Sequence, residues 1–210
     1  RILILSVYLL LSGCQSAYYA TMEKVGVHKR DILVSRVESA NESQKQAQQQ
    51  FKSTLGQLSA MIDFDGGDLL TQYEAMQQQY EQSAEIAEEV SARINAIENV
   101  AGALFEEWQD EIEQFTNAKL KRQSQQKLRE TESRYKTLIR SMHKAEDRMQ
   151  PVLAALKDNT LYLKHNLNAK AIGALQGEYK SIKHDIEKLV VEMNSAITQS
   201  QKFINALEVS

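Results

Sequence analysis

Residues 83–115 read SAEIAEEVSARINAIENVAGALFEEWQDEIEQF, and this stretch indicates the fold class most clearly. Its apolar side chains recur at steps of three and four residues, in the row Ala84, Ala87, Val90, Ile94, Ile97, Ala101, Leu104, Trp108, Ile112 and Phe115. Spacing of this kind places the side chains along one stripe of an α-helix. The stretch therefore predicts a long helix that needs partner helices to cover its apolar side.

The same spacing continues through most of the chain, whereas the two-residue period of a β-strand appears nowhere over a useful length. Two glutamines, Gln44 and Gln77, take stripe positions, where they would weaken a tight apolar core and fix register or admit a partner helix. The predicted stripes run through Leu33, Val37, Ala40, Gln44, Ala47, Phe51, Leu55, Leu58 and Ile62; Leu70, Tyr73, Gln77 and Tyr80; Leu120, Ser124, Lys127, Thr131, Tyr135, Leu138, Met142, Ala145, Met149, Leu153 and Leu156; and Ile172, Leu175, Tyr179, Ile182, Ile186, Leu189, Met193, Ile197, Ile204 and Leu207.

Three breaks divide these rows: the loop DFDGGD at 63–68, a turn near Thr116-Asn117, and a turn near 166–168. They predict helices at about 17–62, 69–116, 119–166 and 169–208. Near-equal helices with short links favour an all-α fold, an elongated antiparallel four-helix bundle of up-down-up-down, coiled-coil-like form. If Asn117 does not end a helix, the second and third helices merge into a three-helix rod. Pro151 should kink the third helix or begin a new segment.

Charge supports the second break independently. Residues 63–118 carry 14 acids and one base, whereas residues 119–148 carry 10 bases and 4 acids. Folding the chain back near residue 117 would bring Glu106, Glu107, Glu111 and Glu113 close to Lys121, Arg122, Lys127 and Arg129. Exposed pairs contribute about 0–1 kcal/mol each, so they would set pairing rather than stability. The alternative is that 119–148 is a surface that binds anions or lipid headgroups.

The single cysteine of the chain, Cys14, follows the apolar run of residues 2–11. This run is too short to span a bilayer, and it has the layout of a secretory signal. Leu11-Ser12-Gly13-Cys14 is similar to the lipobox of bacterial lipoproteins, which implies a signal peptide at 1–13, lipid on Cys14 and a mature domain at 14–210. Gln15 then implies the outer membrane by the sorting rules of that class. The alternative is a free cysteine in an ordinary signal peptide or at the buried start of a helix.

Motifs of catalysis are not recognisable. None of the histidines, His28, His143, His165 and His184, has the Glu-x-x-His spacing of helical di-iron sites. Asp63, Asp65 and Glu74 match three positions of a calcium loop, but its glycine position is Asp68, so a helix corner is the better interpretation. Trp108, Phe105 and Phe115 are expected in the core. We therefore expect no enzyme, cofactor or metal. The chain also has no net basic excess that would suggest nucleic-acid binding.

The phrase LYLKHNLNAKAIGALQGEYKSI at 161–182, with RMQPVLAALKD at 148–158, resembles a family of uncharacterised, wholly helical lipoproteins of gammaproteobacteria. The resemblance covers the mature chain, and implies an envelope address and a helical rod but no activity. We therefore expect a lipid-anchored scaffold or partner-binding rod on the periplasmic face of the outer membrane, with an unidentified protein partner and oligomerisation left open. The alternative is a membrane-active protein that binds headgroups through 119–148.

Overall fold

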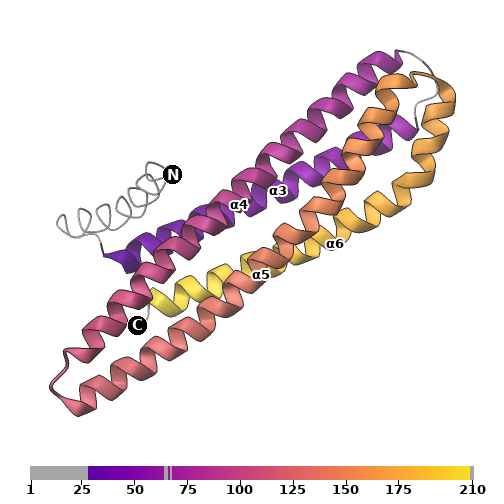
Figure 1. Ribbon diagram of the computed structural model, residues 1–210. Coiled ribbons are helices and arrows are strands. Elements are labelled where there is room, and N and C mark those ends of the chain that lie inside the picture. The colour runs from indigo at the N-terminus through magenta and orange to yellow at the C-terminus, as the bar shows by residue number, and fades with distance from the viewer. Residues whose placement is uncertain (1–27, 64–65, 67, 209–210) are drawn as a thin grey trace, which may run out of the picture.

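The computed structural model describes residues 28–63, 66 and 68–208, which form four helices. These are α3 (Lys29–Ile62), α4 (Leu69–Glu113), α5 (Ala118–His165) and α6 (Ala169–Glu208). Figure 1 shows them side by side in one elongated antiparallel bundle. The predicted all-α bundle is confirmed. The expected start of the first helix at residue 17, and everything said of Cys14, lie outside the described residues.

Each helix contacts two neighbours: α3 and α5 both pack against α4 and α6. This is the arrangement expected when four helices run up, down, up and down in chain order. The α4–α5 turn reaches beyond the first residues of α3 and the last residues of α6, so α4 and α5 are the only described helices at that end of the rod (Figure 1).

The turns are closed by side-chain caps at the predicted breaks. Asp68 Oδ1 accepts a hydrogen bond from the N–H of Leu70 at 3.0 Å, and its Oδ2 accepts one from the Thr71 hydroxyl at 2.8 Å. Bonds from Thr71 and Leu70 hold the pKa of Asp68 below its usual range. Asn117 Oδ1 caps α5 by accepting from the N–H groups of Lys119 and Leu120. The break at Asn117 is therefore real, and the three-helix alternative is wrong.

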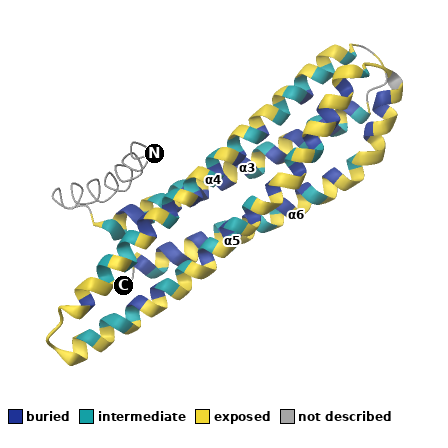
Figure 2. Cartoon of the chain, viewed as in Figure 1, coloured by how far each residue is buried: buried dark blue, intermediate teal, exposed yellow. Residues whose placement is uncertain are grey.

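The core follows the predicted stripes most closely in the middle of the rod, where buried residues line the inward sides (Figure 2). At both ends the prediction is wrong for several residues. Leu70, Phe115 and Leu120 are 47%, 39% and 48% exposed. Their positions explain this, because Leu70 is in the first turn of α4 and the other two flank the projecting α4–α5 turn.

Gln77 is also misassigned: it is only half-buried, and its amide donates to Glu81 Oε1 at 2.8 Å. Met76, one residue earlier, is fully buried in its place. Gln44, by contrast, occupies the core as predicted and is 0% exposed. Neither its Nε2 nor its Oε1 has a hydrogen-bond partner within the described part of the chain.

α5 continues unbroken through Pro151, so the expectation that a new segment begins there is wrong. Proline removes the N–H that would bond to the carbonyl four residues earlier, that of Asp147. Pro151 and Asp147 are both exposed, so that carbonyl can bond to water instead. The helix therefore tolerates the residue.

Candidate interaction surface

The basic segment 119–148 lies on α5, beside the acidic α4, as the charge pattern predicted. Its ion pairs, however, differ from the prediction. Lys121 Nζ reaches Glu113 Oε2 at 2.8 Å, but this is the one predicted pair that forms among the described residues. Glu107 instead binds Lys29 of α3, also at 2.8 Å. The prediction that α4 neutralises the basic segment is therefore wrong for most of it.

The helical rows explain the failure. Arg122, Arg129, Lys136 and His143 are spaced by seven residues, so they lie on one side of α5. His143 contacts Glu98 of α4, which identifies this side as the one that borders α4. The facing row of α4 continues from Glu98 with Phe105 and Ile112, which are apolar. The cations therefore border apolar positions, and most acids of this part of α4 point elsewhere.

Phe105 fills the space between the two helices instead. Its ring lies edge-on against Tyr135 of α5, with centroids 5.4 Å apart. Burial, and then the charge of Glu98, raise the pKa of Tyr135 to about 12. Trp108 is half-buried and donates its indole N–H to Ser124 Oγ of α5 at 2.9 Å. Both aromatic residues thus stabilise the α4–α5 pair, whereas Phe115, expected with them, does not.

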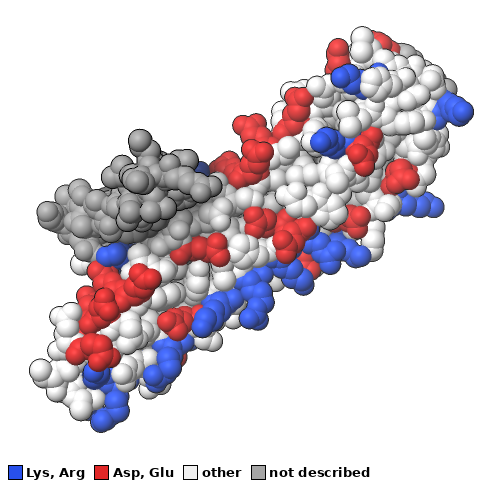
Figure 3. Space-filling view, in the orientation of Figure 1, with Lys and Arg blue, Asp and Glu red and all other residues white. Residues whose placement is uncertain are grey.

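The result is a helix whose cations are largely unneutralised. Within residues 28–63, 66 and 68–208, Lys121 and Lys144 are the only lysines or arginines of this segment that form ion pairs with acids. Figure 3 shows Lys and Arg gathered along the edge of the rod that α5 forms, with Asp and Glu on α4. We call the remaining cations the basic face: Lys119, Arg122, Lys127, Arg129, Arg134, Lys136, Arg140 and Arg148.

A groove of about 510 Å³ runs between this segment and the last turns of α6. Lys127 and Arg134 line it from α5, and Lys202 lines it from α6. Glu130 is its one acid, and the nearly buried Phe203 and Leu207 also line it. Sequence reasoning missed Lys202, because nothing in the sequence indicates that a lysine so distant lies beside the basic segment.

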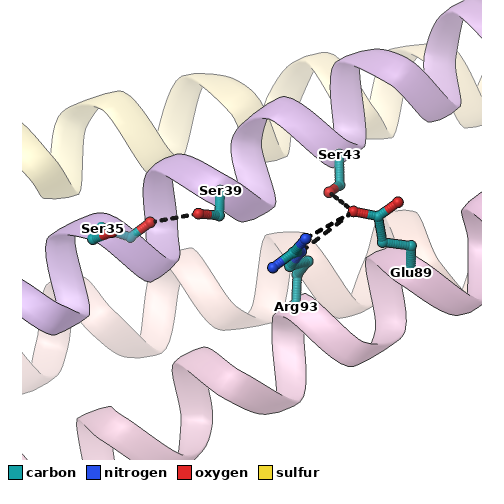
Figure 4. Close-up of polar contacts among 5 residues, drawn as sticks. All are labelled: Ser35, Ser39, Ser43, Glu89 and Arg93. Carbon is teal, nitrogen blue, oxygen red and sulfur yellow. Dashed lines mark hydrogen bonds and ion pairs between the residues drawn. The ribbon is translucent and has the colours of Figure 1, made fainter.

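Between α3 and α4 the polar side chains bind one another, whereas the cations of the basic face lack acidic partners among the described residues. Glu89 Oε1 accepts hydrogen bonds from Arg93 Nη2 at 3.1 Å and from the Ser43 hydroxyl at 3.0 Å (Figure 4). These bonds, first from Arg93 and then from Ser43, hold the pKa of Glu89 below its usual range. The one base in the acidic stretch is therefore used within the bundle.

His143 is the histidine with the most polar surroundings. Its Nδ1 lies 2.8 Å from Glu146 Oε2, and its Nε2 lies 3.0 Å from Glu98 Oε1. The bond to Glu98 is the largest cause of a raised pKa, with Glu146 adding to it and partial burial opposing it. Each ring nitrogen faces a carboxylate, so the protonated ring would link α4 to α5.

This geometry predicts a pH-dependent stability. The pKa of His143 is raised by folding above its ordinary value of 6.5, so its contribution is fully present below about pH 6.5 and is lost as pH rises through the folded pKa. As the pH rises from below 6.5 through the folded pKa of His143, we expect the urea midpoint of wild type to fall more than that of His143→Asn. His184→Asn, at an exposed position on α6, is the control. Parallel curves for wild type and His143→Asn would contradict this role.

Other sequence-derived candidates do not assemble into a site. Among the described residues, no group of three or more His, Cys, Asp and Glu is arranged to hold a metal ion. Asp65 of the calcium-like loop lies outside them, and Asp63 and Glu74 are exposed. His28, His165 and His184 are exposed. None of the described helices is long and apolar enough to cross a bilayer.

Fold and surface together define an elongated four-helix bundle with a basic face. A family model described as "Protein of unknown function (DUF2959)" matches residues 18–207, and the chain belongs to that family. No curated protein and no solved structure gave a match.

Proposed function

We propose that this protein is a non-catalytic, lipid-tethered rod of the bacterial cell envelope that acts as a scaffold or binds a protein partner. The basic face carries the proposal. Its cations lie on an exposed helix without acids to neutralise them within the described part of the chain. Such charge favours encounter with an acidic partner and selects against basic ones.

The length of the bundle supports the role of a spacer. At about 1.5 Å per residue, the 48-residue helix α5 spans roughly 70 Å. A rod of this length, tethered through Cys14 at the periplasmic face of the outer membrane, would carry its α3–α4 and α5–α6 turns away from the anchor. The basic face lies toward the end where α3 begins, since Lys29 binds Glu107 beside it.

The anchor is tested by Cys14→Ser. Because two or three acyl chains hold a protein stably on a membrane, loss of the acylated thiol should move most of the protein from the membrane pellet to the soluble fraction. Globomycin, which inhibits lipoprotein signal peptidase, should block processing of wild type. If Cys14→Ser protein stays in the pellet after a high-salt wash, or globomycin leaves processing unchanged, the lipid anchor is wrong.

The partner is tested by chemical crosslinking in intact cells followed by purification of the tethered protein. We expect crosslinked partners with wild type that are reduced at least threefold with Arg122→Gln/Arg129→Gln/Lys136→Gln. The control is Lys180→Gln/Lys188→Gln, which removes exposed cations from α6. Equal recovery of partners with all three proteins would contradict the proposed role of the basic face.

The same unneutralised cations favour a second candidate, in which α5 binds anionic lipid headgroups. Co-sedimentation with vesicles of phosphatidylglycerol and phosphatidylcholine distinguishes the two functions. Binding that requires the anionic lipid and weakens between 50 and 500 mM salt would favour the second candidate, since salt screens such attraction. Absence of binding at low salt would remove it.

A further inference from the structure

The face formed by α4 and α5 carries both halves of a complementary charge pattern. On α5, the exposed cations Arg122, Arg129, Lys157 and Lys164 are separated by multiples of seven residues, and the last three each directly follow a buried leucine. The core row beside them, which includes Leu128, Met142, Met149, Leu156 and Leu163, keeps the same spacing. The cations therefore form one row, the α5 row, along the α4 side of the helix.

The outermost stripe of α4 supplies matching acids. Glu74, Glu81, Glu106 and Glu113 are exposed on it, and we call them the α4 row. The contacts Glu113–Lys121 and Glu98–His143 show which residues of α4 and α5 lie at equal heights along the rod. On that scale Arg122 is level with Glu113 and Arg129 with Glu106, and Lys157 and Lys164 lie within about one turn of Glu81 and Glu74.

The two rows are not paired within one chain. The α5 row forms no ion pair among the described residues, and of the α4 row only Glu113 does, with Lys121. The matched heights therefore remain available to another molecule. A two-fold axis parallel to two such rods would place α4 of each copy against α5 of the other. The two helices would then run antiparallel, and residues at equal heights would face each other.

The middle of the α4 stripe leaves room for close approach by a second helix. Between its acidic ends lie four small or uncharged, exposed residues: Ala92, Asn95, Asn99 and Gly102. Glycine is disfavoured inside a helix. A side chain at Gly102 would meet no atom within 4 Å, so packing within the chain does not require glycine there. A second helix backbone packed against this stripe would favour glycine, because a side chain there would hold the two helices apart.

We propose that two copies of this chain pair side by side and point the same way, with α4 of each against α5 of the other. Reciprocal pairs Arg122–Glu113 and Arg129–Glu106 form near the projecting turn, and Lys157–Glu81 and Lys164–Glu74 form near the opposite end. The four small residues let the rods approach between them. This pairing goes beyond the proposed function, because it holds whether or not the rod has another partner.

The test is sedimentation velocity of the purified full-length protein in mild detergent, at 50 and 500 mM salt. Wild type should be a dimer that dissociates more readily at high salt. Arg122→Glu/Arg129→Glu, and separately Glu106→Arg/Glu113→Arg, should each weaken dimerisation at least about tenfold, because like charges then face each other. All four substitutions in one chain should restore it. Lys180→Glu/Lys188→Glu on α6 is the matched control and should leave it unchanged.

Gly102→Gln separates association from folding. The substitution should raise the melting temperature of the single chain, because glutamine is the better helix former, and should also weaken the dimer by blocking close approach. A wild type that stays monomeric at about 100 µM and low salt would overturn the pairing. So would a dimer that the charge reversals leave intact, or one that the combined four substitutions fail to restore. Envelope crosslinks retained by a monomeric protein would show that the proposed function stands without it.

Discussion

Gln44→Leu is expected to raise the free energy of unfolding by about 1–3 kcal/mol, the cost of a buried polar group left without a partner. The side chain of Gln44 is 0% exposed, and neither of its amide atoms has a hydrogen-bond partner among the described residues. Its neighbours on the stripe, Ala40 and Ala47, are equally buried. Leucine has a similar volume and removes both unpartnered atoms. Urea denaturation followed by circular dichroism measures the change.

Gln77→Leu is the matched control, because both glutamines sit on the predicted stripe. Gln77 is half-buried and already donates to Glu81, so the same substitution should change stability by less than about 0.5 kcal/mol. Equal effects at the two positions, or a loss of stability in Gln44→Leu, would show that Gln44 is satisfied in solution. A stabilised Gln44→Leu would also indicate that this glutamine is kept for register rather than for stability.

Phe51→Ala is expected to lower the free energy of unfolding by about 3–5 kcal/mol. Phe51 is 0% exposed on α3 and is part of the continuous core of the four helices. Truncation removes apolar contacts and leaves a cavity. The helices around it are long and packed against one another, so they cannot shift to fill it. Because total stability of a domain is about 5–15 kcal/mol, thermal unfolding should detect the loss without difficulty.

The same substitution at Phe115 is the control, because that ring is 39% exposed beside the α4–α5 turn. Phe115→Ala should cost less, about 1–2 kcal/mol, because about two-fifths of the surface of this residue stays in water after folding. A Phe115→Ala effect as large as that of Phe51→Ala would mean that the turn is covered in solution. A small effect at Phe51 would contradict the placement of the core.

The sequence predicted the fold well where packing repeats and poorly where the bundle ends. Along α3, the row from Leu33 to Phe51 is buried as its spacing indicates. Near the start of α4 the choice between Met76 and Gln77 could not be made from spacing alone, since either fits a three-to-four step. Leu120 follows the spacing of a stripe but lies in the first turn of α5, beside the projecting α4–α5 turn, and neither α3 nor α6 extends far enough to cover that turn.

The charge pattern was informative about topology but misleading about contacts. The change of sign near residue 117 located the turn correctly, because it reflects which helices are neighbours. Whether Glu107 meets Lys127 or Lys29 depends on the side of α4 from which it projects, and the structure places it toward α3. The contact between His143 and Glu98 fixes which sides of α4 and α5 face each other. Counting in steps of seven from that contact places Arg129 and Lys136 beside Phe105 and not beside acids.

Photo-crosslinking in intact cells shows whether the tethered rod binds its partner through α5. A photoreactive phenylalanine replaces Gln126, which is exposed among the cations of α5, or Val191, which is 64% exposed on α6. We expect discrete envelope adducts at 126 that are lost in the Arg122→Glu/Arg129→Glu background, and none above background at 191. No adduct at 126, or equal adducts at both positions, would contradict binding through α5.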